Sequence, residues 1–388
     1  MKTQKFDRIL GTIAVLSIII AGFIGARLSN SDVFPSLQEA FPEADRFEAK
    51  SNGSVYQAIL NDADEVVGYV AIATANGYGG PMKVAVAVDL DGNITGMAII
   101  QHRETPSWYR KVSENGFIQS FFGKSYQDPF QLGEDVDGVS SATYTSQAIA
   151  ESALEGSRRI AANQLGLDIP PTPKPKIKFG IPEIALIALF GVGYFGHQRK
   201  YKYKKQLRWA SLLVGMIVLG FMYNKPLTLS MVNQVLLSYW PQWQSNIYWY
   251  LMIGGIIFVF TVDNKNPYCQ WFCPFGAAQE CIGLIGGAKV YSPGQYRNFF
   301  TWLRRGVVWF AILVAMLFRS PGLTSYEIFG TLFALVGSNL QFSLLGIVLI
   351  ASLFIKRPWC AYLCPIGPLD EFIRMVRKWI LEKVKKKS

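Results

Sequence analysis

The chain has 388 residues, enough for two or three units of ordinary domain size. Hydrophobic residues make up 51% of it, which is too apolar for an average soluble enzyme, and the net charge is +11. A basic balance is typical of nucleic-acid-binding proteins, but here the Lys and Arg residues cluster beside apolar runs, as in cytoplasmic membrane loops. We therefore expect a protein in contact with membrane lipid and no nucleic-acid partner.

Apolar runs occur near residues 9–26, 179–195, 209–223, 247–262, 307–318 and 342–355. A helix needs about 20 apolar residues to cross a bilayer, so the runs predict an α-helical polytopic membrane protein with about six spans. Six spans place both termini in the cytoplasm, and the basic clusters that flank the runs then all lie inside. The first run follows a basic start, as a signal peptide does, but its length favours an uncleaved anchor.

The predicted organisation has four parts. Residues 1–28 form an N-terminal transmembrane anchor, and the polar residues 29–168 form a domain outside the cell inner (plasma) membrane. A stiff Pro-rich linker at 169–178 separates this domain from the transmembrane core at 179–388. The protein is thus expected to be multi-pass, with one extracytoplasmic domain.

The extracytoplasmic domain has the pattern of an α+β fold. Residues 67–74 are apolar and β-rich, and apolar residues alternate over 84–90. A turn at 91–93, with the sequence Asp-Gly-Asn, predicts a hairpin whose second strand runs over 94–100. Residues 146–162 have the apolar spacing of a helix.

A loop of small residues precedes this helix; its members are Asp137, Gly138, Val139, Ser140, Ser141, Ala142 and Thr143. A phosphate on the Thr143 hydroxyl would lie at the helix N-terminus, where free N–H groups and the dipole favour an anion. The alternative is that Thr143, Thr145 or Ser146 only caps the helix. On local physics alone, capping is the favoured interpretation.

Four of the five cysteines form two C-x-x-x-C-P motifs at 267–276 and 358–367. Each motif follows a predicted span, and their similarity indicates an internal parallel repeat. Parallel repeats pack about an axis normal to the membrane, so we expect the two cysteine pairs to meet at its inner edge.

The metal-site prediction consists of four thiols: Cys269, Cys273, Cys360 and Cys364. They suit an iron–sulfur cluster of unknown nuclearity. A zinc site and two reversible disulfides remain alternatives. Cys281 aligns with Phe372 in the second copy, so we do not expect it to be a ligand.

The loop that ends at Thr143 resembles the flavinylation motif of FMN-binding domains, as in the RnfG and NqrC subunits of ion-pumping redox complexes. Residues 77–81 and 102–106 resemble the same domain in the same order. This resemblance implies that a flavin transferase joins FMN to Thr143 through a phosphoester. The implied cofactor-binding residues are Thr143, Asp137, Ser140, Ser141, Ala142, His102, Glu104 and Thr105.

The chain departs from this family in two places. The family usually has Gly where this chain has Ser141, which is also compact. It often continues Gly-Leu-Gly where this chain has Ser107, Trp108 and Tyr109. Whether Trp108 and Tyr109 stack on the flavin or pack in the domain core stays open.

An outer FMN domain followed by spans and two C-x-x-x-C-P motifs resembles the NosR/NirI family of membrane flavoproteins. NapH-type electron-transfer proteins carry similar paired motifs. The resemblance implies transmembrane electron transfer between a cytoplasmic ferredoxin-like donor or quinol and an extracytoplasmic acceptor. A membrane redox sensor or a maturation factor of a respiratory reductase is the alternative.

The predicted topology leaves a gap between the two cofactor sites. Thr143 and the cysteines face each other across about 30 Å of hydrocarbon, which is long for one electron-transfer step. Either the cofactors lie closer than the bilayer thickness suggests, or a quinone or another cofactor bridges them.

Overall fold

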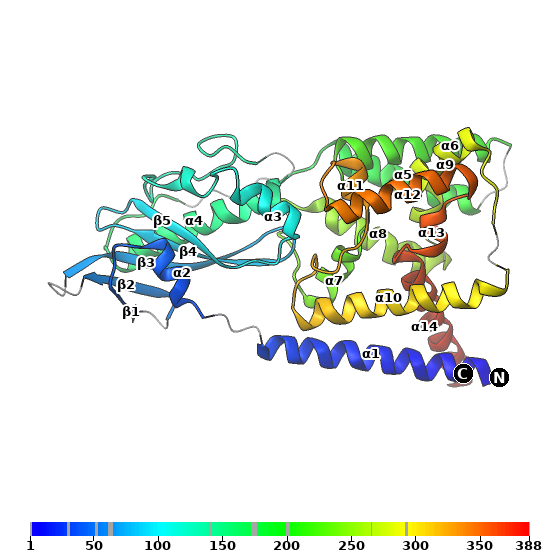
Figure 1. Cartoon of the computed structure of the whole chain (residues 1–388), viewed down its shortest axis with the longest axis horizontal. Coiled ribbons are helices and arrows are strands. Elements are labelled where there is room, and N and C mark those ends of the chain that lie inside the picture. Colours follow the sequence, from blue (N-terminus) through cyan, green and yellow to red (C-terminus); the bar gives the residue numbers. More distant parts are fainter. Residues whose placement is uncertain are drawn as a thin grey trace.

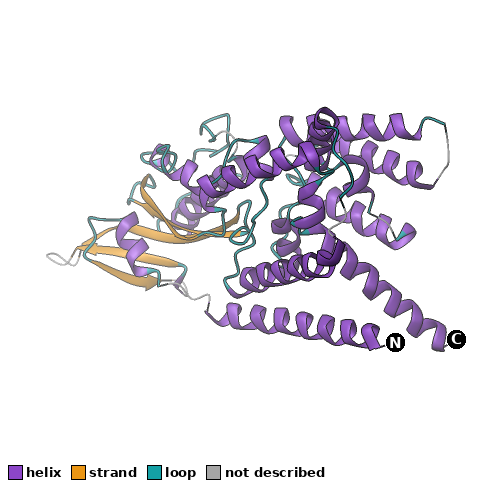
Figure 2. Ribbon diagram, turned by 45° about the vertical axis from the view of Figure 1, so that its right-hand side comes forward, coloured by secondary structure: helices purple, strands orange, loops and turns teal. Residues whose placement is uncertain are grey.

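A computed structural model describes residues 2–28, 32–50, 53–60, 65–139, 142–171, 177–198, 202–264, 266–291 and 294–387. An α+β domain lies at one end of a bundle of helices, and both termini lie at the other end (Figure 1). Figure 2 shows that all the strands belong to this domain. Ser140, Ser141 and linker residues 172–176 lie outside the described residues.

The domain is built on a five-stranded antiparallel sheet in which each strand pairs with the next along the chain. The strands are β1 (Arg46–Lys50), β2 (Val55–Leu60), β3 (Glu65–Asn76), β4 (Pro81–Val88) and β5 (Ile94–Gln101). The predicted hairpin joins β4 to β5, with Gly92 at a φ of 89°. The Asp89 carboxylate fixes the turn by accepting from the Asp91 and Asn93 amides.

Both faces of the sheet are covered because side chains alternate along each strand. Val84 and Val86 of β4 pack against the predicted helix, α4 (Thr143–Asn163), on one face. Ala85 and Ala87 point to the other face, where α2 (Phe34–Ala40) packs. The sheet therefore holds the start of α4 at a fixed place. Two further helices, α3 (Pro106–Ser113) and η2 (Gln119–Phe121), follow β5.

Six helices occupy the predicted apolar runs: α1 (Lys2–Leu28), α5 (Ile181–Gln198), α6 (Lys204–Val214) continued by η3 (Gly215–Met222), α8 (Ile247–Asp263), α10 (Arg297–Leu317) and α12 (Asn339–Phe354). Three segments are long and apolar enough to cross a membrane, at 7–28, 204–222 and 294–317. The apolar parts of α5, α8 and α12 are shorter, 10–17 residues. The six-span topology therefore stays a prediction.

Shorter helices complete the core. They are α7 (Leu229–Leu237), η4 (Tyr268–Phe272), α9 (Pro274–Gly286), η5 (Gly294–Tyr296), α11 (Phe329–Phe333), α13 (Pro358–Tyr362) and α14 (Ile366–Lys387). The sequence did not predict α7 and α11, which lie on the side of the core that faces the α+β domain (Figure 1).

Direct contacts dock the domain onto the core. Arg103 Nη1 donates a hydrogen bond of 2.7 Å to the Phe318 carbonyl. The Gln234 side-chain amide of α7 donates to the Tyr78 carbonyl in the turn between β3 and β4. Close approach requires glycine at Gly80, where a Cβ would lie 2.5 Å from the Tyr239 ring. The two parts therefore share one packed interface.

Helix α5 lies close to the first cysteine motif because it carries small residues on that side. A Cβ at Gly193 would lie 2.8 Å from Pro267 Cβ. A Cβ at Gly196 would overlap the ring of Trp271, which is buried in the core. Gly191, on the same helix, has open space around it.

We predict that Gly196→Ala destabilises the full chain by about 1–3 kcal/mol, because the added methyl overpacks Trp271. The matched control is Gly191→Ala, which adds the same methyl to the same helix without a clash. Thermal unfolding in detergent measures both variants. Equal melting temperatures for the two variants would contradict the packing.

Candidate functional site

Three segments that are distant in the sequence meet at the start of α4. Glu104, which follows β5, joins the other two: one carboxylate oxygen accepts from the Gly79 amide at 3.0 Å, and the other accepts from Thr145 Oγ1 at 2.6 Å. A Cβ at Gly77 would overlap the Glu104 carboxylate, so this position requires glycine. The segments that resemble FMN-binding domains are thus brought together.

Glu104 is only 3% exposed, so it holds the loops in place from behind and does not present a free carboxylate. Burial raises the pKa of its carboxyl, and the hydrogen bonds from Thr145 and from the backbone of Gly79 and Tyr78 oppose that shift. Burial also raises the pKa of the neighbouring Tyr78 to about 12. Tyr78 is therefore neutral at ordinary pH.

Thr143 is the first residue of α4, and its side chain is exposed. Within the described residues, α4 has no side-chain cap: its N-cap is Ala142, and Ser146 Oγ instead accepts from the Val139 amide at 3.2 Å. The capping alternative is therefore not observed. Thr143 lines a cavity of about 620 Å³ between the domain and the membrane core.

The other predicted FMN residues divide between two places. Ala142 and Thr105 line the same cavity as Thr143. Asp137 instead lines a separate hollow of about 440 Å³ together with Lys111. The predicted Ser140 and Ser141 lie outside the described residues.

The structure also answers the open question about the two aromatic residues. The His102 ring stacks on the Tyr109 ring, with 3.7 Å between centroids, so Tyr109 is already occupied by a residue of its own domain. Trp108 packs against the domain core and also lines the cavity beside Thr143. Of the two, only Trp108 is placed to meet a flavin there.

The two cysteine motifs share one backbone geometry. The amide of Cys273 donates to the Tyr268 carbonyl at 2.8 Å, and the amide of Cys364 donates to the Trp359 carbonyl at 2.8 Å. In each motif the second cysteine immediately precedes a helix that begins after or at its proline. Gly276 N donates to Cys273 Sγ at 3.4 Å, and the backbone amide of Gly367 faces Cys364 in the same way.

All five cysteines are free thiols, and the four predicted ligands lie near one another. Cys269 interacts electrostatically with the other three. Polar side chains also approach the sulfurs, since Gln279 Nε2 lies 3.5 Å from Cys360 Sγ and Asn266 Nδ2 lies 3.8 Å from Cys269 Sγ. Among the described residues, no three His, Cys, Asp or Glu side chains are already closed around a metal position.

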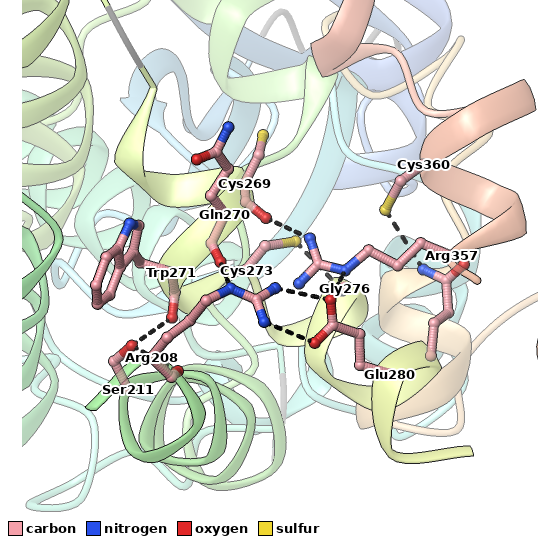
Figure 3. Close-up of polar contacts among 11 residues, drawn as sticks. Arg208, Ser211, Cys269, Gln270, Trp271, Cys273, Gly276, Glu280, Arg357 and Cys360 are labelled. Atoms are coloured by element: carbon pink, nitrogen blue, oxygen red, sulfur yellow. Dashed lines mark hydrogen bonds and ion pairs between the residues drawn. The ribbon is translucent and has the colours of Figure 1, made fainter. Parts of the chain in front are cut away.

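A buried ion cluster surrounds the first motif (Figure 3). Arg208 binds Glu280 through two hydrogen bonds, of 2.7 and 3.0 Å, and Arg357 Nε lies 2.9 Å from the same carboxylate. Arg357 Nη1 donates to the Cys269 carbonyl at 2.7 Å. One arginine from beside the second motif therefore holds the first motif.

Arg357 has donor capacity left over. Its Nη2 atom is buried and has no hydrogen-bond partner in the described part of the chain. The guanidinium also interacts electrostatically with Cys273 and Cys360, one from each motif. A buried cation beside four thiols compensates the negative charge that thiolate ligands would bring. The donor set and its surroundings therefore fit an iron–sulfur cluster.

Arginine–glutamate pairing recurs at the second motif. Glu371 accepts from Arg304 and Arg305 at 3.1 Å each, and Arg304 Nη1 approaches the Cys360 carbonyl at 3.4 Å. Sequence reasoning missed these pairs. A signal was present, because Glu280 and Glu371 follow Cys269 and Cys360 at the same spacing.

Family profiles match both parts of the chain. The FMN-binding domain matches residues 77–155, and the 4Fe-4S binding domain matches residues 245–293 and 341–386. The two 4Fe-4S segments contain the two cysteine motifs.

Individual relatives agree with this division. An RnfG-type protein of Cereibacter sphaeroides, which is part of an ion-translocating oxidoreductase complex, is 31% identical over 166 residues, 37% of this chain and 74% of that protein. The protein NirI of Paracoccus denitrificans is 26% identical over 208 residues, 48% of this chain and 30% of NirI. The putative electron transport protein YccM of Escherichia coli is 34% identical over 128 residues, 29% of this chain and 35% of YccM.

The match to the Cereibacter sphaeroides protein covers more than two thirds of that relative, and the profiles supply both cofactor domains. The chain therefore belongs to the NosR/NirI-like membrane flavoproteins, with an FMN-binding domain of the RnfG type found in ion-translocating oxidoreductase complexes.

Proposed function

We propose that the protein carries electrons across the inner membrane between a site held by its four ligand cysteines and an FMN bound covalently to Thr143. One observation carries the proposal. Helices α8 and α12 both begin at the cavity that Thr143 lines and both end shortly before a cysteine pair. The same two helices therefore connect the two sites.

The length of these helices suits a membrane-crossing path. Helix α8 has 17 residues and α12 has 16. At about 1.5 Å per residue, each spans roughly 25 Å, close to the thickness of a bilayer's hydrocarbon core. The Thr143 side would face outward and the cysteines inward, with both termini in the cytoplasm.

The chain's own residues have distinct tasks in this proposal. Thr143 would hold the flavin phosphate by a phosphoester made by a flavin transferase, and Glu104 would keep the surrounding loops in position. Cys269, Cys273, Cys360 and Cys364 would hold the iron–sulfur cluster. Together the two cofactors supply one-electron and two-electron redox chemistry, which side chains alone do not provide.

The proposed partners lie on opposite sides of the membrane. A ferredoxin-like protein or quinol would deliver electrons on the cytoplasmic side, where the basic clusters attract an acidic donor. An extracytoplasmic protein would accept them from the flavin. The RnfG-type relatives belong, by name, to oxidoreductase complexes, which supports a role in a larger redox system.

Replacing Thr143 by Val should abolish covalent flavin, because valine has no hydroxyl to carry the phosphoester. The measurement is flavin fluorescence of the denatured full-length chain after electrophoresis. Thr145→Ser is the control, since it keeps a hydroxyl for Glu104 and should retain the signal. Fluorescence that persists in Thr143→Val would contradict the attachment site.

Glu104→Gln should change how stability depends on pH. Because the folded-state pKa of Glu104 is raised, the folded protein binds its proton more tightly than the unfolded chain does, and the stability from this group falls as pH rises through the folded-state pKa. Glutamine keeps the shape without titrating. The melting temperature of Glu104→Gln relative to wild type should therefore increase between about pH 5 and about pH 8.

The exposed Glu155 supplies the control for this experiment. Glu155→Gln should shift the melting temperature by a constant amount over the same range. A constant difference between wild type and Glu104→Gln would rule out the titration of a buried Glu104.

Arg357→Gln should lower the midpoint potential of the cysteine-held site, since losing a nearby positive charge disfavours the added electron. Each ten-fold change in the redox equilibrium corresponds to about 59 mV for one electron. Redox titration followed by EPR measures the shift. Arg305→Gln, which removes an arginine from the Glu371 pair, should shift the potential less, and Arg357→Lys should restore most of it. Equal shifts for Arg357→Gln and Arg305→Gln would refute this role for Arg357.

A further inference from the structure

The cavity beside Thr143 has walls from both halves of the protein. The FMN-binding domain contributes residues around Tyr78, Trp108 and Thr143, and the membrane core contributes residues of α7, α8 and α11 and of the loops beside them. Its volume of about 620 Å³ lies in the range of sites for small-molecule ligands. The hollow that contains Asp137 is smaller, about 440 Å³, and Thr143 does not line it.

We propose that the flavin ring tethered to Thr143 is held in this cavity, so that the membrane core supplies one wall of the flavin site. The inference rests on the covalent attachment proposed above and extends it from the phosphate to the ring.

Unpartnered polar atoms in the core wall support this placement. Ser230 is 2% exposed and Thr331 is 1% exposed; both line the cavity, and neither hydroxyl has a hydrogen-bond partner among the described residues. The side-chain oxygen of Asn224, also in the wall, is buried without a partner in the same part of the chain. Buried polar groups normally find partners. The carbonyl and N–H groups along one edge of an isoalloxazine ring would provide them.

The aromatic part of the wall is already fixed in place. Trp249 Nε1 donates to the Gln234 side-chain oxygen at 2.7 Å, and the Gln234 amide nitrogen donates to the Tyr78 carbonyl of the domain. One glutamine thus ties an indole of the core to the FMN-binding domain. Planar ligands bind well between rigid aromatic faces, and Trp108 supplies a second face from the domain side.

This placement also shortens the gap between the two cofactor sites. Phe329 lines the cavity, and its ring centroid lies 5.1 Å from that of Phe275 and 6.3 Å from that of Trp359. Phe275 lies two residues after Cys273, and Trp359 directly precedes Cys360. A ring in the cavity would therefore be separated from the cysteine motifs by one packed aromatic layer. The full length of α8 or α12 would not lie between them.

The test compares a bulky substitution in each hollow of the full-length protein in detergent. Ser230→Trp fills the cavity, and Ser120→Trp fills the hollow that contains Asp137. Iodide quenching of flavin fluorescence reports exposure of the ring, and in-gel fluorescence reports covalent attachment. We expect Ser230→Trp to raise the quenching constant several-fold with attached flavin unchanged, and Ser120→Trp to have no effect.

Because Ser230→Trp places a large ring in the protein interior, Thr331→Val serves as a second, nearly isosteric variant. It should alter the visible circular dichroism of the attached flavin without loss of folding. Attached flavin whose quenching responds to Ser120→Trp, or whose quenching and dichroism respond to none of these variants, would overturn the placement. Loss of in-gel flavin from the wild type would instead overturn the covalent attachment.

Discussion

Lipid offers no hydrogen bonds to a polypeptide backbone, and this constraint decides where chemistry can lie in the membrane core. Each segment that crosses hydrocarbon has to satisfy its own N–H and C=O groups as a helix, so reactive side chains collect where helices end. Both cysteine motifs follow this rule, since each lies between the end of one helix and the start of another. Thr143 likewise lies at a helix start, on a domain that packs against the opposite helix ends.

Charge has to be balanced wherever it is buried, and the core does this with arginine. Glu280 is 5% exposed and would be costly without partners, but Arg208 and Arg357 surround it. Because Arg357 also bonds the Cys269 carbonyl, the charge cluster fixes the backbone of the first motif. The pairing of Glu371 with Arg304 and Arg305 has the same character at the second motif. Rigid, positively charged surroundings are what a site of four thiolates requires.

The sequence predicted those features whose signals are local. The hairpin at Gly92, the helix after Thr143 and the six apolar helices were predicted because turn chemistry and hydrophobic periodicity act over a few residues. The paired cysteines were recognisable from their spacing alone. The prediction that Thr143 lies at a helix start agrees with the structure, whereas capping by its side chain does not occur.

Features that depend on long-range contacts were beyond reach of the sequence. Arg208 and Glu280 meet only after the chain has crossed several helices, and no local pattern marks them as a pair. The cavity forms between two parts of the chain, so its wall residues Ser230 and Thr331 have no motif. Tyr109 was an equal candidate with Trp108 for flavin contact, and only the stack with His102 distinguishes them. Asp137 lies in the same loop as Thr143, but the fold turns it toward a different hollow.

The central claim is that two redox sites on opposite sides of one membrane are connected through this chain. The most direct measurement is bleaching of the Thr143-bound flavin in oriented proteoliposomes when a membrane-impermeant protein reductant is added on the cysteine side. The account predicts rapid bleaching in the wild type and none in a variant with Cys269 and Cys360 replaced by Ser. Bleaching that is equally fast without these cysteines, or bleaching only when the reductant is on the Thr143 side, would contradict it.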